Sequence, residues 1–225
     1  MLRDNILKVQ ERIAVACSKN GRDLADIRIV AVTKGRPVED IVEALSYGLT
    51  DIGENRVQEA VLKYKNLQIN RPIESKAAHW HMLGHLQTNK VKDAVKLFDF
   101  IQSVDSTGLA YKINDQAEKT GKIQDILLEV KTSNEITKTG FLPEEISDAA
   151  GQLCMLKNLR IKGLMTIAPV TQNGLHDAHL SFSLLRRIKD NIDTNLLLSM
   201  GMTDDFEVAI EEGANILRIG RGIFG

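Results

Sequence analysis

The sequence has few of the features that would place it outside a reducing, aqueous compartment. Its 225 residues include two cysteines, Cys17 and Cys154, which form neither a paired metal-binding spacing nor a disulfide framework. No apolar run approaches the ~18–20 residues that span a bilayer, and charges are interspersed through the amino terminus, unlike a signal peptide. The formal net charge is -1, so no basic field indicates a nucleic-acid or membrane partner. We therefore expect a cytoplasmic protein.

Segments that separate domains are missing as well. The chain has four prolines, and no stretch rich in proline, glycine and serine interrupts it. Hydrophobic residues make up 43% and charged residues 26%, which is ordinary for a globular protein with a full core. A length of 225 residues suits one large domain, so we expect a single domain over residues 1–225.

Apolar runs alternate with amphipathic segments along the whole chain. The run IRIVAVT is too continuous and too rich in β-branched residues for a surface helix, and it is typical of a buried parallel strand. By the same criteria, strands are predicted over 27–33, 50–55, 79–83, 100–104, 125–131, 159–167, 196–201 and 216–220. Helices are predicted over 38–48, 56–67, 88–98, 108–119, 143–156, about 176–192 and 204–213, and another before the first strand.

Eight predicted strands with a helix in each gap indicate an α/β fold. Strict alternation implies parallel strands joined by right-handed crossovers. Eight such units in roughly 200–250 residues match a single (β/α)8 TIM-type barrel; the alternative is a doubly wound open sheet, because strand order cannot be read from one sequence. The chain ends five residues after the last predicted strand, so an amino-terminal helix is expected in place of the eighth helix.

Unusual residues stand at the carboxyl ends of the predicted strands, where the active sites of such barrels lie. The first strand ends on Lys34, directly before a Gly-Arg-Pro turn. After the seventh strand come the hydroxyls of Ser199 and Thr203, with Gly201 between them and Thr203 expected as the N-cap of the next helix. Loops after the seventh and eighth strands of a barrel often bind phosphate, although each of these residues alone also fits a turn or a solvated surface.

The eighth strand adds a second set of candidates. Gly220 and Arg221 form a flexible turn with a guanidinium, which suits phosphate oxygens. Arg218 alternates with apolar neighbours and can face a different side of the strand. A lysine opposite a phosphate site can form a Schiff base with a phosphorylated aldehyde, either a sugar phosphate or pyridoxal 5′-phosphate. Arg218 as a cation beside a ring nitrogen favours pyridoxal 5′-phosphate. The alternative for Arg218 is a salt bridge at the end of the strand.

Seven motifs together resemble a known family. They are AVTK, GENRVQE, HMLGHLQTNK, SNEITKTG, GLMTIAP, LSMGMTDDFEVAI and RIGRGIFG, spread over about residues 27–225. In this order they are similar to the motifs of the pyridoxal-phosphate homeostasis proteins, single-domain relatives of the alanine racemase amino-terminal barrel. The resemblance implies that pyridoxal 5′-phosphate is bound by Lys34, Asn55, Ser199, Gly201, Met202, Thr203, Arg218, Gly220 and Arg221.

Within that set the resemblance implies distinct roles. Lys34 would form the Schiff base, Asn55 would lie near the cofactor ring and Arg218 beside the pyridine nitrogen, with the segment 199–203 and Gly220 around the phosphate. Three residues depart from the family pattern: Arg56 stands where an aromatic residue is expected, Lys131 where an asparagine is expected, and Arg221 where a small or hydroxyl residue is common. Arg221 therefore binds the phosphate or turns to solvent.

The expected function is a non-catalytic role in intracellular cofactor homeostasis. A racemase needs acid/base groups on both faces of its substrate; in the related enzymes the second group comes from a carboxyl-terminal domain, and the three tyrosines here fall on predicted helices. A racemase-like enzyme of low activity, with His81 as the missing acid, is the main alternative, and a Schiff-base aldolase is another. The expected partners are the cofactor and apo-enzymes that need it, the chain being expected to act as a monomer without a bound metal.

Overall fold

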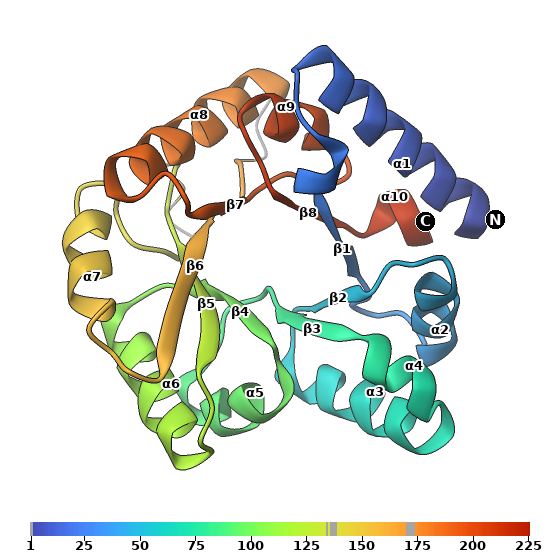
Figure 1. Ribbon diagram of the computed structural model, residues 1–225, viewed down its shortest axis with the longest axis horizontal. Coiled ribbons are helices and arrows are strands. Elements are labelled where there is room, and N and C mark those ends of the chain that lie inside the picture. Colours follow the sequence, from blue (N-terminus) through green and yellow to red (C-terminus); the bar gives the residue numbers. More distant parts are fainter. Residues whose placement is uncertain (1, 134, 136–138, 170–173) are drawn as a thin grey trace.

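The computed structural model describes residues 2–133, 135, 139–169 and 174–225. In this part of the chain eight parallel strands form a closed barrel in sequential order, with β8 paired to β1 (Figure 1). The strands are β1 (Arg28–Val32), β2 (Asp51–Glu54), β3 (His79–Met82), β4 (Phe100–Val104), β5 (Gln124–Glu129), β6 (Leu159–Met165), β7 (Leu197–Ser199) and β8 (Ile216–Ile219). The predicted barrel is confirmed, and the open-sheet alternative is excluded.

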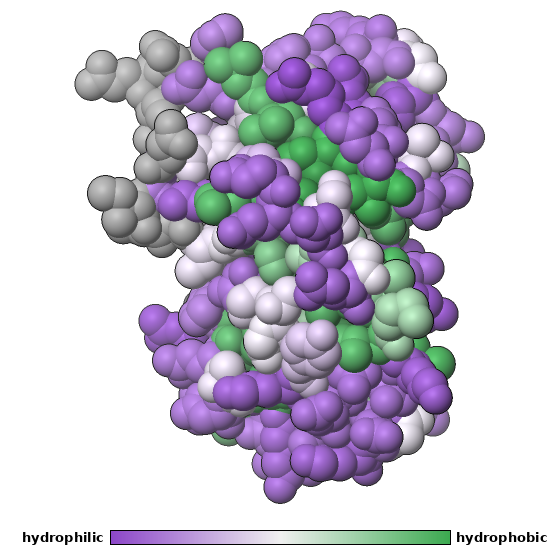
Figure 2. Space-filling view, turned by 90° about the vertical axis from the view of Figure 1, so that its left-hand side faces the viewer, coloured by the Kyte–Doolittle hydropathy of each residue, from purple (hydrophilic) through white to green (hydrophobic). Residues whose placement is uncertain are grey.

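Helices surround the strands as an outer ring. They are α1 (Leu2–Lys19), α2 (Val38–Ser46), α3 (Val57–Asn70), α4 (Pro72–Ala77), α5 (Val91–Leu97), α6 (Thr107–Lys119), α7 (Ile146–Leu153), α8 (Leu175–Ile192), α9 (Phe206–Glu211) and α10 (Arg221–Phe224), with 3-10 turns η1 (Leu24–Asp26) and η2 (Thr88–Lys90). Figure 2 shows the side of the molecule at the left of Figure 1, where hydrophilic residues cover most of the surface and hydrophobic residues show between them. None of the helices within the described ranges has the length and apolarity needed to cross a membrane.

The amino-terminal helix occupies the place expected for it. Figure 1 shows α1 beside α9 and α10, on the outer side of the junction between β8 and β1. The side-chain amide of Asn5 donates to the carbonyl of Ile223, and Arg12 pairs with Glu207 at 2.7 Å. Two short helices, α4 and α10, were not predicted.

Side-chain alternation divides the core into two layers. Outward-facing residues of the strands pack with the helices in one large hydrophobic cluster, which includes Ala31 and Trp80. Inward-facing residues form a smaller apolar cluster inside the barrel, which includes Val30 and Leu83 with Val32 packed against it. Residues of β1 with the parity of Val30 therefore face the interior and, beyond the strand, the mouth at its carboxyl end.

Candidate functional site

Lys34 lies at the mouth of the barrel, two residues after the end of β1. It has the parity of Val30 and Val32, which belong to the interior layer. Its side chain is exposed, and within the described residues it makes no hydrogen bond or ion pair. Among the described residues, Lys34 is thus an amine at the mouth without a partner, which leaves it accessible to a ligand.

The backbone on either side of Lys34 is held tightly. The carbonyl of Thr33 accepts a hydrogen bond of 3.0 Å from the N–H of Arg36, which closes a turn around Lys34 and Gly35. Gly35 has φ of +70°, the conformation that the third residue of a type II turn requires and that favours glycine. The N–H of Thr33 donates to the carbonyl of Gly53 on β2 at 3.0 Å.

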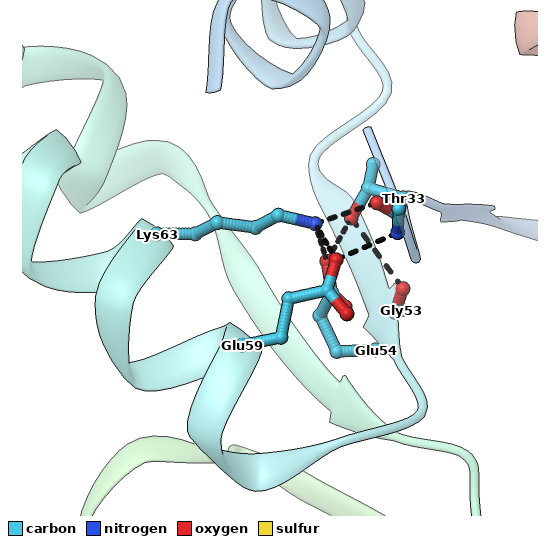
Figure 3. Close-up of polar contacts among 6 residues, drawn as sticks. Thr33, Gly53, Glu54, Glu59 and Lys63 are labelled. Atoms are coloured by element: carbon cyan, nitrogen blue, oxygen red, sulfur yellow. Dashed lines mark hydrogen bonds and ion pairs between the residues drawn. The ribbon is translucent and has the colours of Figure 1, made fainter. Parts of the chain in front are cut away.

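A buried ionic cluster lies behind this turn (Figure 3). Nζ of Lys63 lies 2.6 Å from the carbonyl oxygen of Thr33, 2.7 Å from Oε1 of Glu54 and 2.6 Å from Oε1 of Glu59. The hydroxyl of Thr33 donates to Glu54 at 2.6 Å, and the N–H of Gly35 donates to Glu59 at 2.6 Å. We call Glu54, Glu59 and Lys63 the clamp.

The clamp carboxylates have opposite pKa directions. Burial raises the pKa of Glu54, which is fully buried and whose Oε2 has no hydrogen-bond partner, even though Lys63 and Thr33 act against the shift. Glu59 is less buried, and its hydrogen bonds from Lys63 and Gly35 outweigh burial and lower its pKa. Lys63 uses its three N–H donors on protein oxygens, whereas the amine of Lys34 has no partner among the described residues.

The loops that follow β7 and β8 touch each other at the same mouth. The N–H of Gly222 donates a hydrogen bond of 3.0 Å to the hydroxyl of Thr203. Gly201 has φ of +91°, and a Cβ there would lie 2.5 Å from a side chain of α9, so a glycine is required where the chain leaves β7. A Cβ added to Gly220 would lie 3.5 Å from Cβ of Val32, which places this glycine beside β1.

Thr203 does not cap the following helix, contrary to the prediction. The N-cap of α9 is Asp205, whose side chain makes no capping bond, while the hydroxyl of Thr203 is used by the longer-range bond from Gly222. The carboxylate of Asp205 accepts from the N–H of Met202 at 2.6 Å. Burial raises the pKa of Asp205, against the effects of this hydrogen bond and of Arg218.

Arg221 extends from the start of α10 into solvent. Its side chain is 75% exposed and forms an ion pair with Asp204, which is 72% exposed. Of the two positions that the sequence leaves open for this arginine, the structure shows the solvent-facing one. An exposed pair of this kind contributes only ~0–1 kcal/mol to stability.

Arg218 lies inside the barrel, as its alternation on β8 predicts, and is 5% exposed. Its guanidinium donates to Oγ of Ser199 at 2.7 Å and to the carbonyl of Thr166 at 2.7 Å. Burial lowers the pKa of Arg218 to about 10, although the charges of Asp205 and Glu129 act against the shift. Arg218 is therefore still a cation at neutral pH.

A line of hydrogen bonds continues from Arg218 across the barrel interior. The hydroxyl of Ser199 donates to Oε1 of Gln102 at 2.6 Å, and Nε2 of Gln102 lies 2.9 Å from Nδ1 of His81. Nε2 of His81 lies 2.8 Å from Oδ1 of Asp51, on β2. Ser199, Gln102 and His81 are all fully buried. We call the five residues from Arg218 to Asp51 the interior chain.

Hydrogen-bonding capacity fixes the direction at the two ends of the interior chain. Arg218 can only donate to Ser199, and an ionised Asp51 can only accept from His81. The hydroxyl of Ser199 donates onward to Oε1 of Gln102. Burial alone would raise the pKa of Asp51, but the hydrogen bond from His81 and nearby positive charge lower it.

His81 does not line the mouth, contrary to the position that was expected of it as a candidate acid. The period-two alternation of β3 points it into the barrel, where it is enclosed by its two hydrogen bonds and stacks on Phe100 at 5.1 Å between ring centroids. The histidine on the mouth side is His85, in the loop after β3, which is exposed and has Nδ1 2.9 Å from Asp105.

The other predicted site residues lie around the same mouth. Asn55 directly follows β2, is half-buried and approaches the loop after β3, since a Cβ at Gly84 would lie 2.4 Å from the carbonyl oxygen of Asn55. Met202 is half-buried in the loop after β7. Ser199 lies deeper than the rest, and its assignment to the phosphate stays a prediction. The motif SNEITKTG falls partly outside the described residues.

Sequence reasoning missed the residues that support this site. The clamp pair Glu59 and Lys63 is spaced i,i+4 on α3, a signal that the sequence does contain. Gln102 carried no signal, because its role depends on partners from β3 and β7. In the described part of the chain, no group of three or more histidine, cysteine, aspartate or glutamate side chains could hold a metal ion.

The chain is similar to proteins of known name over its whole length. Residues 5–225 match the family model for the alanine racemase N-terminal domain. A pyridoxal phosphate homeostasis protein of Aquifex aeolicus is 40% identical, with 99% of this chain and 96% of that protein covered. A crystal structure of an unknown protein from Bifidobacterium adolescentis is 35% identical, with a TM-score of 0.92 and coverage of 99% and 94%. The structure of PipY from Synechococcus elongatus with PLP bound is 33% identical, with a TM-score of 0.79 and coverage of 96% and 100%.

Proposed function

Because the chain belongs to the family of the pyridoxal phosphate homeostasis proteins, we propose that it binds pyridoxal 5′-phosphate and acts in intracellular cofactor homeostasis. The observation that carries the proposal is that an amine without a partner among the described residues and two glycine-containing loops meet at one barrel mouth, with a buried guanidinium in the barrel interior. These groups come from β1, β7 and β8, which are neighbours in the barrel. Separate elements are thus available for the aldehyde, the ring and the phosphate.

The chemistry of the groups at the mouth fits this cofactor. When bound, pyridoxal phosphate supplies an aldehyde, a pyridine nitrogen and a phosphate. Lys34 offers the amine that holds the aldehyde as a Schiff base. Arg218 offers N–H donors to the ring nitrogen and keeps its own proton, because even its lowered pKa is about 10. Gly201 and Gly220 allow a close backbone approach to the phosphate, and Thr203 adds a hydroxyl.

Four further residues complete the proposed site. Asn55 lies at the ring side of the mouth, and Met202 packs beside the phosphate loop. Arg221 contributes its backbone N–H, because its guanidinium is held in solvent by an ion pair. Ser199 acts through Arg218, since its hydroxyl both accepts from Arg218 and donates along the interior chain.

Borohydride trapping tests the attachment at Lys34. Protein loaded with pyridoxal phosphate is reduced and digested, and peptide mass mapping should place the reduced cofactor on the peptide that contains AVTKGRP. An adduct on another lysine, such as Lys90 in η2, would overturn the assignment.

The Lys34→Ala variant separates attachment from folding. The side chain is exposed and without a partner in the described structure, so the free energy of unfolding should change by less than about 0.5 kcal/mol. Cofactor binding should weaken and lose its visible absorbance, while the phosphate loops remain. A large loss of stability in urea unfolding would show that Lys34 is a structural residue.

The alternative function is a racemase-like enzyme of low activity. Such an enzyme needs a second acid or base opposite Lys34, and the described residues offer His85, paired with Asp105 at the rim, as the histidine on that side. We expect cofactor-loaded protein to exchange the α-proton of alanine slowly in deuterated water without multiple-turnover inversion. Inversion near ~10 s⁻¹, the median for enzymes, would favour the enzyme, and a His85→Gln variant would then identify the group.

A further inference from the structure

The buried clamp behind Lys34 has no part in the proposed contacts with the cofactor, yet its bonds converge on the turn that carries this lysine. We propose that Glu54, Glu59 and Lys63 are positioning residues, which hold the Thr33–Arg36 turn so that the amine of Lys34 is directed to the cofactor aldehyde. This inference rests on the proposed function and deepens it.

The clamp engages the backbone on both sides of Lys34. The ammonium of Lys63 donates to the carbonyl of Thr33 (Figure 3). Glu59 accepts from the N–H of Gly35. The peptide groups that flank Lys34 are therefore tied to α3, while the side chain of Lys34 itself is left without a partner in the described structure. The turn is rigid, and the lysine that it carries is available.

Charge and burial make the clamp a costly structure with little benefit to folding alone. Glu54 and Lys63 are 0% and 7% exposed, and Oε2 of Glu54 is buried with no hydrogen-bond partner in the described part of the chain. Removing buried ions from water is unfavourable, and apolar residues of similar volume often stabilise a fold as well or better. A buried ionic cluster of this kind beside the proposed Schiff-base lysine is expected where it holds the residues of a site in a fixed geometry.

The step that the clamp assists is the attachment itself. The ammonium of Lys34 first loses one proton to solvent, to which the side chain is open. The resulting neutral amine then forms a C=N bond to the aldehyde carbon, and the carbonyl oxygen leaves as one molecule of water with the two hydrogens of that amine. A turn already held in the reactive geometry loses less conformational freedom when the bond forms. The clamp should therefore favour covalent attachment and leave non-covalent binding of the ring and phosphate unchanged.

Two ligands separate these contributions. Pyridoxal 5′-phosphate binds both covalently and non-covalently, whereas pyridoxine 5′-phosphate has an alcohol in place of the aldehyde and reports non-covalent binding alone. In Glu59→Ala the Gly35 N–H and Lys63 each lose an ionic partner, so the ratio of the two affinities should fall about tenfold, the effect of one hydrogen bond to a charged group. Affinity for pyridoxine 5′-phosphate should change less than about twofold.

Matched variants control for structural damage. Glu59→Gln keeps an oxygen acceptor for the Gly35 N–H and should restore the ratio to within about threefold of wild type. Glu43→Ala removes an exposed carboxylate from the neighbouring helix α2 and should have no effect. If Glu59→Ala fails to fold, hydrogen exchange in the wild type gives the test, because the clamp requires the Gly35 amide to be protected in an exposed turn.

Each outcome decides between the two proposals. Wild-type protein that binds pyridoxine 5′-phosphate but is not trapped by borohydride at Lys34 overturns the Schiff-base function, and the clamp with it. A different result overturns the clamp proposal alone. In it, wild-type protein is trapped at Lys34, but Glu59→Ala has the same ratio of affinities for the two ligands as wild type, or binds both ligands equally weakly relative to wild type. The clamp proposal is also overturned if the hydrogen of the Gly35 amide exchanges at the rate of an unfolded chain.

Discussion

Replacing Ser199 by alanine removes the central hydroxyl of the interior chain and should destabilise the barrel strongly. The hydroxyl accepts from Arg218 at 2.7 Å and donates to Gln102 at 2.6 Å, and both partners are buried. The substitution leaves one charged donor and one neutral acceptor unsatisfied inside the barrel. At ~1–3 kcal/mol for each of the two buried unsatisfied groups, the free energy of unfolding should fall by about 2–6 kcal/mol.

Ser103→Ala is the matched control for this prediction. Ser103 is also a fully buried serine of the barrel, on β4, but its hydroxyl makes one neutral hydrogen bond of 2.6 Å to the carbonyl of Gly84. Its loss should cost about 0.5–1.5 kcal/mol. Urea unfolding of the two variants, with unchanged m values, measures the difference. Equal losses of stability in the two variants would refute the proposed contribution of the interior chain to the free energy of unfolding.

The same variant decides how Ser199 serves the cofactor. If Ser199 holds Arg218 in place, Ser199→Ala should weaken pyridoxal 5′-phosphate and unphosphorylated pyridoxal by the same factor, because both present the ring nitrogen. If Ser199 contacts the phosphate, as the sequence resemblance implies, the phosphorylated ligand alone should weaken. A selective loss would therefore refute the role that its hydrogen bonds indicate.

Three other variants, one of them with a matched control, test the site and its support. Gly201→Ala should lower the free energy of unfolding in urea by at least about 2 kcal/mol, because φ of this residue is +91° and the new Cβ would overlap α9. As the control, Gly151→Ala lies inside α7 with nothing within 4 Å of the new Cβ, and it should stabilise the protein by about 0.5–1 kcal/mol. Because the pKa of Asp51 is lowered in the folded state, its carboxylate stabilises the fold at pH values above 3.8, the ordinary pKa of the group. This contribution is lost as the pH falls through the lower folded-state pKa. The difference in unfolding free energy between wild type and Asp51→Asn should therefore shrink below pH 3.8; a constant difference would contradict the bond to His81. Arg221→Ala should weaken pyridoxal phosphate less than about threefold, and a loss of roughly 10- to 150-fold by isothermal titration would show that the arginine does bind the phosphate.

The sequence predicts the barrel well because its strands are marked by local chemistry. Continuous β-branched runs such as the one that became β1 need no tertiary information to be recognised. The two helices that were not predicted are short. The four residues of α10 are too few to show a hydrophobic period. The start of α4 is indicated by Pro72 at its first position, a signal that an analysis of periodicity does not use. The misassigned cap at Thr203 has a different cause, because its hydroxyl is taken by a residue in another loop.

The candidate site could be predicted only where one strand carries the information. Parity along β1 and β8 places Lys34 at the mouth and Arg218 inside. The interior chain depends instead on which strands face each other across a closed barrel, and no local pattern in the sequence records that relation. For the same reason His81, read as a residue of the mouth, lies beneath it, where β2 and β4 supply its partners.

The pairing of β8 with β1 also determines when the site can exist. Arg28 of β1 is in register with Ile216 of β8, and Arg22 donates to the carbonyl of Ile210, 188 residues further along the chain. Contacts between such distant segments form slowly, because the intervening chain must first be confined. During synthesis β1 leaves the ribosome well before β7 and β8, so under the proposed function Lys34 is made before the loops that would bind the phosphate. Under the proposed function, we therefore expect cofactor binding to follow closure of the barrel. A ligand that contacts both β1 and β8 should slow the separation of these two strands.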